Sequence, residues 1–276
     1  MSNRVTRVLA GCFGAMVMLA VPASVSAGSD AERMSEIRKN GGCPRCDLGL
    51  AELRFLNVEN ADFTRTNLRE TDLKEAVLKN GNFRRADLRR AEAERADFSG
   101  SDFTDASMRS VDLEKANLLN AVFQGADLRD ADMHASIVAG ASFEDADLRN
   151  VFLIRAVATG TSFKNAKLDD ANLERVDLTG ANFQGARMRQ AKLDRIMAHN
   201  ADFSGADMSG VRFVSSDLSG ANLTNVDFDG ALLRRTRLVG ADLTGAYNLD
   251  PSRILGACGD ATTKLPKGIE LADCSY

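Results

Sequence analysis

Residues 61–80 decide the fold; divided into fives, they read ADFTR TNLRE TDLKE AVLKN. The same pattern runs without insertion or deletion from residue 51 to residue 250, as forty consecutive units. Most units carry a small residue, often Ala, at position 1, Asp or Asn at position 2, and Leu or Phe at position 3. The repeat therefore specifies a shape, and function has to be sought where the repeat is broken.

A period of five residues excludes an α-helix as the repeating unit. An α-helix advances about 100° per residue, so equivalent positions five apart would spread around its axis. In an extended segment the side chains alternate, so positions 1 and 3 can point inward while position 2 points outward. Positions 4 and 5 would then turn a corner, and we expect a β-solenoid.

Phenylalanine marks a second period, of twenty residues. It occupies position 3 at Phe63, Phe83, Phe103, Phe123, Phe143, Phe163, Phe183 and Phe203. The simplest explanation is that residues twenty apart lie above one another, so that four units make one coil and these rings stack. Ten coils at about 4.8 Å each would give a rod of roughly 48 Å.

From Cys46 to Asp250, these in-register units resemble those of pentapeptide-repeat proteins. The resemblance implies an all-β fold, a right-handed quadrilateral β-helix with four units per coil and about ten coils. The resemblance also makes the known roles of family members candidates for this chain. Some members are cytoplasmic and mimic DNA to regulate type II topoisomerases, some lie in the thylakoid lumen, and many are exported without an assigned activity.

Residues 1–27 have the pattern of an export signal. A basic start precedes an apolar run over residues 8–23 and small residues up to Ala27. We expect cleavage near Ala27, a periplasmic or secreted location, and no transmembrane segment in the mature chain. Lipidation at Cys12 is the alternative, although the apolar run continues beyond this residue instead of ending before it.

The segments around the repeat are expected to close its ends. Residues 28–45 form an N-terminal cap segment with a short helix that begins at Asp30 as N-cap and stops at Asn40-Gly41-Gly42. Its apolar positions at helical spacing are Ala31, Met34 and Ile37. Residues 46–250 form the solenoid, and residues 251–276 form a C-terminal tail. Caps are needed because an open end exposes core side chains and unpaired strand groups.

Four cysteines flank the repeat in two pairs. The pairs lie at opposite ends of the expected rod, which excludes one zinc site made by all four sulfurs. In an exported protein we expect two local disulfides, Cys43–Cys46 and Cys258–Cys274. A thiol redox role for Cys43 and Cys46 remains an alternative, although a thioredoxin-like motif would need the first thiol at a helix N-terminus.

One column of residues twenty apart is rich in arginine. Its basic members are Arg69, Arg89, Arg109, Arg129, Arg149 and Arg189, with Asp169 interrupting them. Two interpretations stay open. Nearby aspartates, namely Asp87, Asp127, Asp130 and Asp147, can neutralise the column, or the stacked guanidiniums can bind carboxylate or phosphate groups.

A second column is apolar where the repeat prefers Asp or Asn. Its members at position 2 are Val77, Ile137, Val157 and Met197. Single exposed apolar side chains need no explanation, but a column of them forms a candidate surface for a partner or for a homodimer.

Nothing in the sequence suggests catalysis. His134 and His199 fall on different expected faces, and no loop interrupts the coils to form a pocket. We therefore expect no catalytic residue, metal site or cofactor, and a non-enzymatic exported structural or interaction protein. Its partner would be a protein or an anionic component of the cell envelope.

The main alternative function is that of a DNA-mimicking topoisomerase regulator. The formal net charge of −4 is modest for a DNA mimic, and the arginine column would interrupt an acidic stripe. The same balance of charge predicts no strong affinity for nucleic acid.

Overall fold

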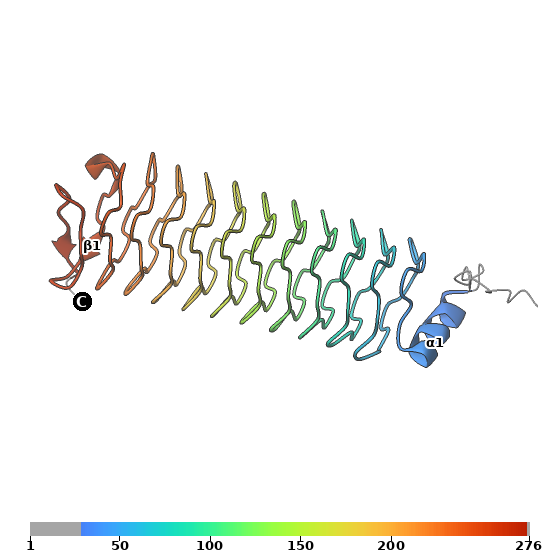
Figure 1. Ribbon diagram of the computed structural model, residues 1–276. Coiled ribbons are helices and arrows are strands. Elements are labelled where there is room, and N and C mark those ends of the chain that lie inside the picture. Colours follow the sequence, from blue (N-terminus) through green and yellow to red (C-terminus); the bar gives the residue numbers. More distant parts are fainter. Residues whose placement is uncertain (1–28, 275–276) are drawn as a thin grey trace, which may run out of the picture.

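The structure, a computed structural model, describes residues 29–274, so the expected export signal, its cleavage site and Cys12 lie outside the described residues. Helix α1 (Asp30–Asn40) is followed by a long series of coils, then by the 3-10 helix η1 (Pro251–Arg253) and the strands β1 (Cys258–Gly259) and β2 (Ala272–Asp273). The coils stack into a rod with α1 at one end and β1 at the other (Figure 1). Within residues 29–274, no helix is both long and apolar enough to cross a membrane.

Parallel bridges join residues that are twenty apart, as the phenylalanine spacing predicts. They run from Gly42↔Asp62 to Asp227↔Tyr247, and each involves the residue at position 2. The ladder begins at Gly42, before the expected start of the solenoid at Cys46. The segment expected to be a separate cap therefore already contributes to the first coil.

The hydrogen bonds of one unit explain why position 2 prefers Asp or Asn. In the unit 61–65, the amides of Asp62 and Phe63 donate to carbonyls of the two adjacent coils at 2.9 and 2.8 Å. The amide of Thr64 donates instead to the Asp62 carboxylate at 2.9 Å. A side-chain oxygen at position 2 thus closes an Asx turn and satisfies the amide that the ladder leaves over.

The core is a set of stacked layers of small and medium side chains with one column of phenylalanines. Side chains at positions 1 and 3 are buried in nearly every coil. The eight phenylalanines from Phe63 to Phe203 stack on one another with ring centroids 4.6 to 5.2 Å apart. The predicted aromatic ladder is therefore confirmed.

Helix α1 covers the first coil. Its N-cap is Ser29 and not the expected Asp30, because the Ser29 hydroxyl accepts from the Glu32 amide while the Glu32 carboxylate accepts from the Ser29 amide. Ile37 is buried against the core, and Met34 is partly buried. Gly41 ends the helix with a φ of 67°, a left-handed conformation that glycine adopts without steric cost.

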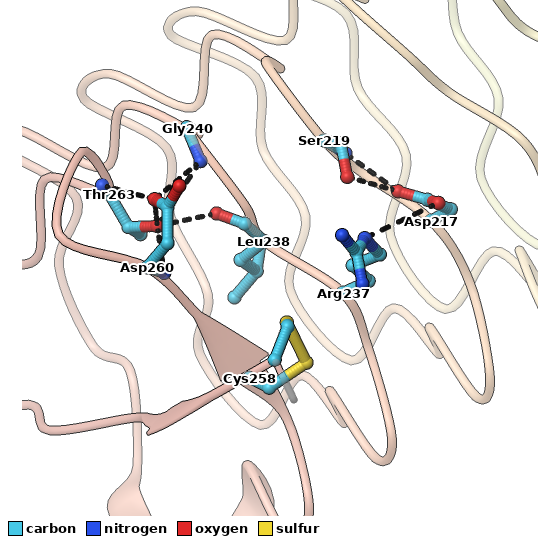
Figure 2. The surroundings of a disulfide bond; sticks show 9 residues. Asp217, Ser219, Arg237, Leu238, Gly240, Cys258, Asp260 and Thr263 are labelled. Carbon is cyan, nitrogen blue, oxygen red and sulfur yellow. Dashed lines mark hydrogen bonds and ion pairs between the residues drawn. A yellow bond between two sulfur atoms is a disulfide. The ribbon is translucent and has the colours of Figure 1, made fainter. Parts of the chain in front are cut away.

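The C-terminal tail extends the ladder. Bridges join Arg237 to Cys258 and Asp242 to Lys264, so the tail adds backbone pairs to the last regular coil. The Thr263 hydroxyl donates to the Leu238 carbonyl at 2.9 Å, a contact drawn in Figure 2. Strand β1 then pairs in parallel with β2, and a disulfide links Cys258 in β1 to Cys274, directly after β2. The tail is thus an irregular additional coil.

Candidate functional site

The two expected cysteine pairs are both bonded. The Cα atoms are 5.5 Å apart in Cys43–Cys46 and 5.0 Å apart in Cys258–Cys274. Cys43 follows the C-terminal end of α1, whose partial negative charge disfavours a thiolate. Its amide also donates to the carbonyl of Asp62 in the next coil at 2.8 Å. This placement fits a structural cross-link of the first coil better than a redox centre.

The apolar column is contiguous only at its centre. Ile137 and Val157 are bridge partners, and their exposed fractions are 43% and 42%. Asp97 and Asn117 separate Val77 from Ile137, and Asp177 separates Val157 from Met197. The structure therefore brings together two of the four expected residues and leaves Val77 and Met197 isolated.

One further exposed apolar residue, Leu119, extends this region. Position 4 of one coil lies beside position 2 of the next, eighteen residues on, as the ring pair of His134 and Phe152 shows at 6.0 Å between centroids. The same offset places Leu119 beside Ile137. The sequence pattern contained this signal, because an apolar residue at position 4 also points outward. We call Leu119, Ile137 and Val157 the apolar patch.

Three arginines of the basic column are neutralised within their own units. The carboxylate two residues earlier accepts from the guanidinium Nε at 2.7 Å in Arg89, 2.7 Å in Arg129 and 2.8 Å in Arg149. The guanidinium of Arg129 lowers the pKa of Asp127 by hydrogen bonding, against the effect of partial burial. For these residues the structure favours the self-neutralised interpretation.

Arg69 and Arg109 have no carboxylate at position 2 of their own units, where Asn67 and Ser107 stand respectively. Arg109 pairs with Asp130, through Nε at 3.1 Å. Within residues 29–274, Arg69 forms no ion pair. At the far end of the column, Arg189 pairs with Asp207 at 2.5 Å.

A surface hollow of about 310 Å³ lies over the N-terminal part of the column. Its lining residues are Arg69, Arg89, Arg90, Arg109 and Ser110, and no carboxylate is among them. The expected anion-binding column is thus reduced to its N-terminal part, which we call the arginine hollow.

The histidines form two separate contacts. His134 Nδ1 lies 2.6 Å from the Asp132 carboxylate, and His199 Nε2 lies 3.5 Å from that of Asp217. Among the described residues 29–274, no three His, Cys, Asp or Glu side chains come together in a way that could hold a metal ion.

Comparison with known proteins identifies the repeat. A family model described as pentapeptide repeats matches in eight copies between residues 46 and 247. HetL, a pentapeptide repeat protein involved in heterocyst differentiation regulation in the cyanobacterium Nostoc sp. strain PCC 7120, is 27% identical, with 82% of this chain and 92% of HetL covered and a TM-score of 0.45.

Two more solved structures are similar. QnrB1, a plasmid-mediated fluoroquinolone resistance protein, is 20% identical, with 80% of this chain and 90% of that chain covered and a TM-score of 0.42. A pentapeptide repeat protein of the Arabidopsis thaliana thylakoid lumen is 28% identical, with 41% of this chain and 65% of that chain covered and a TM-score of 0.21. Among curated proteins, none matches the chain.

The family assignment depends on the family model, which spans well over half of the sequence. The chain belongs to the pentapeptide-repeat family, whose members fold as right-handed β-helices.

Proposed function

We propose that the protein is a non-enzymatic, exported interaction scaffold, a rod of about ten four-sided coils that presents fixed columns of side chains to its partners. The uninterrupted ladder from Gly42 to Tyr247 carries this proposal. Residues at position 2 within the ladder pair through their backbone with a coil on either side, and no inserted loop interrupts the coils between residues 42 and 247. Such a surface suits recognition of a partner better than conversion of a substrate.

The apolar patch supports a protein partner or a second copy of the chain. An apolar residue at position 2 cannot accept from the amide at position 4. Within residues 29–274, the amides of Ala139 and Thr159 accordingly have no protein acceptor. The patch therefore lacks two side-chain hydrogen bonds and exposes apolar area to water. A partner that covers this apolar area would offset the cost of exposing it.

Substitution tests the patch. We expect Ile137→Glu with Val157→Glu to abolish a dimer in analytical ultracentrifugation, or to abolish in-cell cross-links to a partner. Val77→Glu with Met197→Glu is the matched control, because it places the same two charges at isolated sites of the same column. Unchanged sedimentation and unchanged cross-links in the double variant would contradict an interface at the patch.

Export rests on the pattern of residues 1–27, and fractionation with N-terminal sequencing tests it. The expected result is a mature chain that begins near Gly28 and lies outside the cytoplasm. A cytoplasmic chain that retains Met1 would contradict export.

The alternative of topoisomerase regulation rests on family membership alone. The net charge of −4 and the arginine column count against DNA mimicry. Purified protein is expected not to change the rate of DNA supercoiling by gyrase. Inhibition that survives high salt would favour the alternative.

A further inference from the structure

The arginine column changes character where one residue type changes. Wherever position 2 is Asp, as at Asp87, Asp127 and Asp147, the arginine two residues later folds back onto that carboxylate. Asn67 and Ser107 offer no charge, so Arg69 and Arg109 extend without this internal partner. Arg69 and Arg109 lie on either side of Arg89 in the stack, and all three line the same hollow.

The hollow keeps many hydrogen-bond donors free. Each guanidinium has five N–H donors. Arg89 uses Nε and one terminal nitrogen on Asp87, Arg109 uses Nε on Asp130, and Arg90 makes a single 3.4 Å contact with Glu70. The carboxylates thus hold three guanidiniums in place from outside the hollow and leave their remaining donors available.

We propose that the arginine hollow binds a phosphate-bearing anion. This inference rests on the scaffold function proposed above, because the anion is bound and not converted. Guanidinium forks match the oxygens of phosphate in a bidentate manner. Arg69, Arg89 and Arg109 rise in ladder steps of about 4.8 Å, so one phosphate can bridge two of them and a chain of phosphates can reach all three. A single carboxylate occupies only one fork, which favours phosphate over an acidic side chain.

Calorimetric titration of purified protein with inorganic tripolyphosphate at low salt tests the site. We expect Arg69→Gln with Arg109→Gln to weaken binding at least about tenfold, because charge-assisted hydrogen bonds are lost. Arg129→Gln with Arg149→Gln removes the same charge from the same column but outside the hollow, and should change the affinity by no more than about twofold. Equal losses in the two double variants would show general charge attraction and would overturn the site.

A second variant adds a negative charge beside the hollow without removing an arginine. Ser107→Asp places a carboxylate next to Arg109, as Asp87 lies next to Arg89, so the hollow loses net positive charge and Arg109 loses free donors. Tripolyphosphate binding should then weaken about tenfold or more while the melting temperature stays unchanged. Unchanged affinity in this folded variant would contradict the proposal.

Vesicles distinguish the sources of the phosphate. Co-sedimentation with phosphatidylglycerol vesicles but not with phosphatidylcholine vesicles, lost in Arg69→Gln with Arg109→Gln, would support a lipid headgroup. Binding of tripolyphosphate without vesicle binding would support a soluble ligand. Binding of polyglutamate alone, or of no probe, would overturn the phosphate site. These assays use purified protein, so their result does not depend on export or on the apolar patch.

Discussion

A position-2 carboxylate often serves two roles at once. Asp102 accepts from the Thr104 amide at 2.8 Å and from Arg84 of the previous coil at 2.9 Å. Partial burial raises the pKa of Asp102, but the hydrogen bonds from Thr104 and Arg84 outweigh burial and leave it lowered. One side chain therefore closes its own turn and links two coils, which explains why the repeat keeps Asp and Asn so consistently.

The phenylalanine ladder predicts a large loss of stability on truncation. Phe123 is fully buried between Phe103 and Phe143, at centroid distances of 4.9 and 4.6 Å. We expect Phe123→Ala to lower the free energy of unfolding by about 3–5 kcal/mol, measured by urea denaturation. Phe152→Ala is the control, because this ring is 44% exposed and should cost less than about 1 kcal/mol. Similar losses in both variants would contradict the central role of the ladder.

Backbone strain at position 5 gives a stabilising substitution. Phe55 has a φ of 57°, in the left-handed region that costs an L-residue roughly 1–2 kcal/mol, and its side chain is 59% exposed. Glycine avoids this cost but loses more entropy on folding, so Phe55→Gly should raise the free energy of unfolding by up to about 1 kcal/mol in urea denaturation.

The reverse substitution is the control for this strain. Gly160 has a φ of 63°, and a Cβ added there would meet nothing within 4 Å. Gly160→Ala should therefore lower the free energy of unfolding by about 1 kcal/mol through the backbone alone. If Phe55→Gly is destabilising instead, the exposed ring contributes more than its backbone strain costs.

Among the elements, the two ends depart most from the sequence-based expectations. Hydrophobic spacing and the Asn40-Gly41-Gly42 stop were enough to predict α1, but both Ser29 and Asp30 are good N-cap residues. Only the reciprocal contact with Glu32 decides between them. The extra coil of the tail escaped prediction because the five-residue pattern ends at Asp250, whereas backbone bridges need no particular side chain.

The Cys258–Cys274 disulfide should stabilise this irregular coil. It closes a loop with a sequence separation of 16, and such a loop is worth about 3 kcal/mol through the entropy of the unfolded chain. We expect Cys258→Ser with Cys274→Ser to speed amide hydrogen exchange in residues 251–274 roughly hundredfold and to leave the central coils unchanged. Cys43→Ser with Cys46→Ser, which opens a shorter loop, should have a smaller effect at the other end. Accelerated exchange throughout the rod would contradict local stabilisation.

The tail should also loosen in acid. The hydrogen bond from Thr262, together with those from Gly240 and Thr263, lowers the pKa of Asp260 to about 2. An unfolded aspartate titrates near 3.9, so a lowered folded pKa stabilises the tail above about pH 4, and this contribution is lost as the pH falls toward 2. Pepsin should therefore cut within residues 251–274 much faster at pH 2 than at pH 4.

Asp260→Asn is the control for this acid effect. The amide oxygen of Asn can still accept hydrogen bonds but does not titrate, so cleavage of this variant should depend less on pH. Equal pH dependence in the variant and the parent protein would show that Asp260 is not responsible.

For the whole molecule, periodicity predicted the stacking of coils and the membership of each surface column. It also places Ile137 and Val157 in adjacent coils and separates Val77 and Met197 from them, and the bridges confirm this. It did not predict how the basic column divides, because each arginine pairs according to the residue two positions before it. That outcome depends on side-chain geometry, which a list of residues twenty apart does not contain.

The bridge spacing of twenty also sets a rule for how such a chain can change in length. An insertion of one unit would shift every downstream column by a quarter of a coil. Each column would then continue on the neighbouring side of the rod beyond the insertion. An insertion of four units would lengthen the rod and leave every side in phase. Internal duplication of whole coils can thus increase the distance between two binding surfaces along the axis without altering either surface.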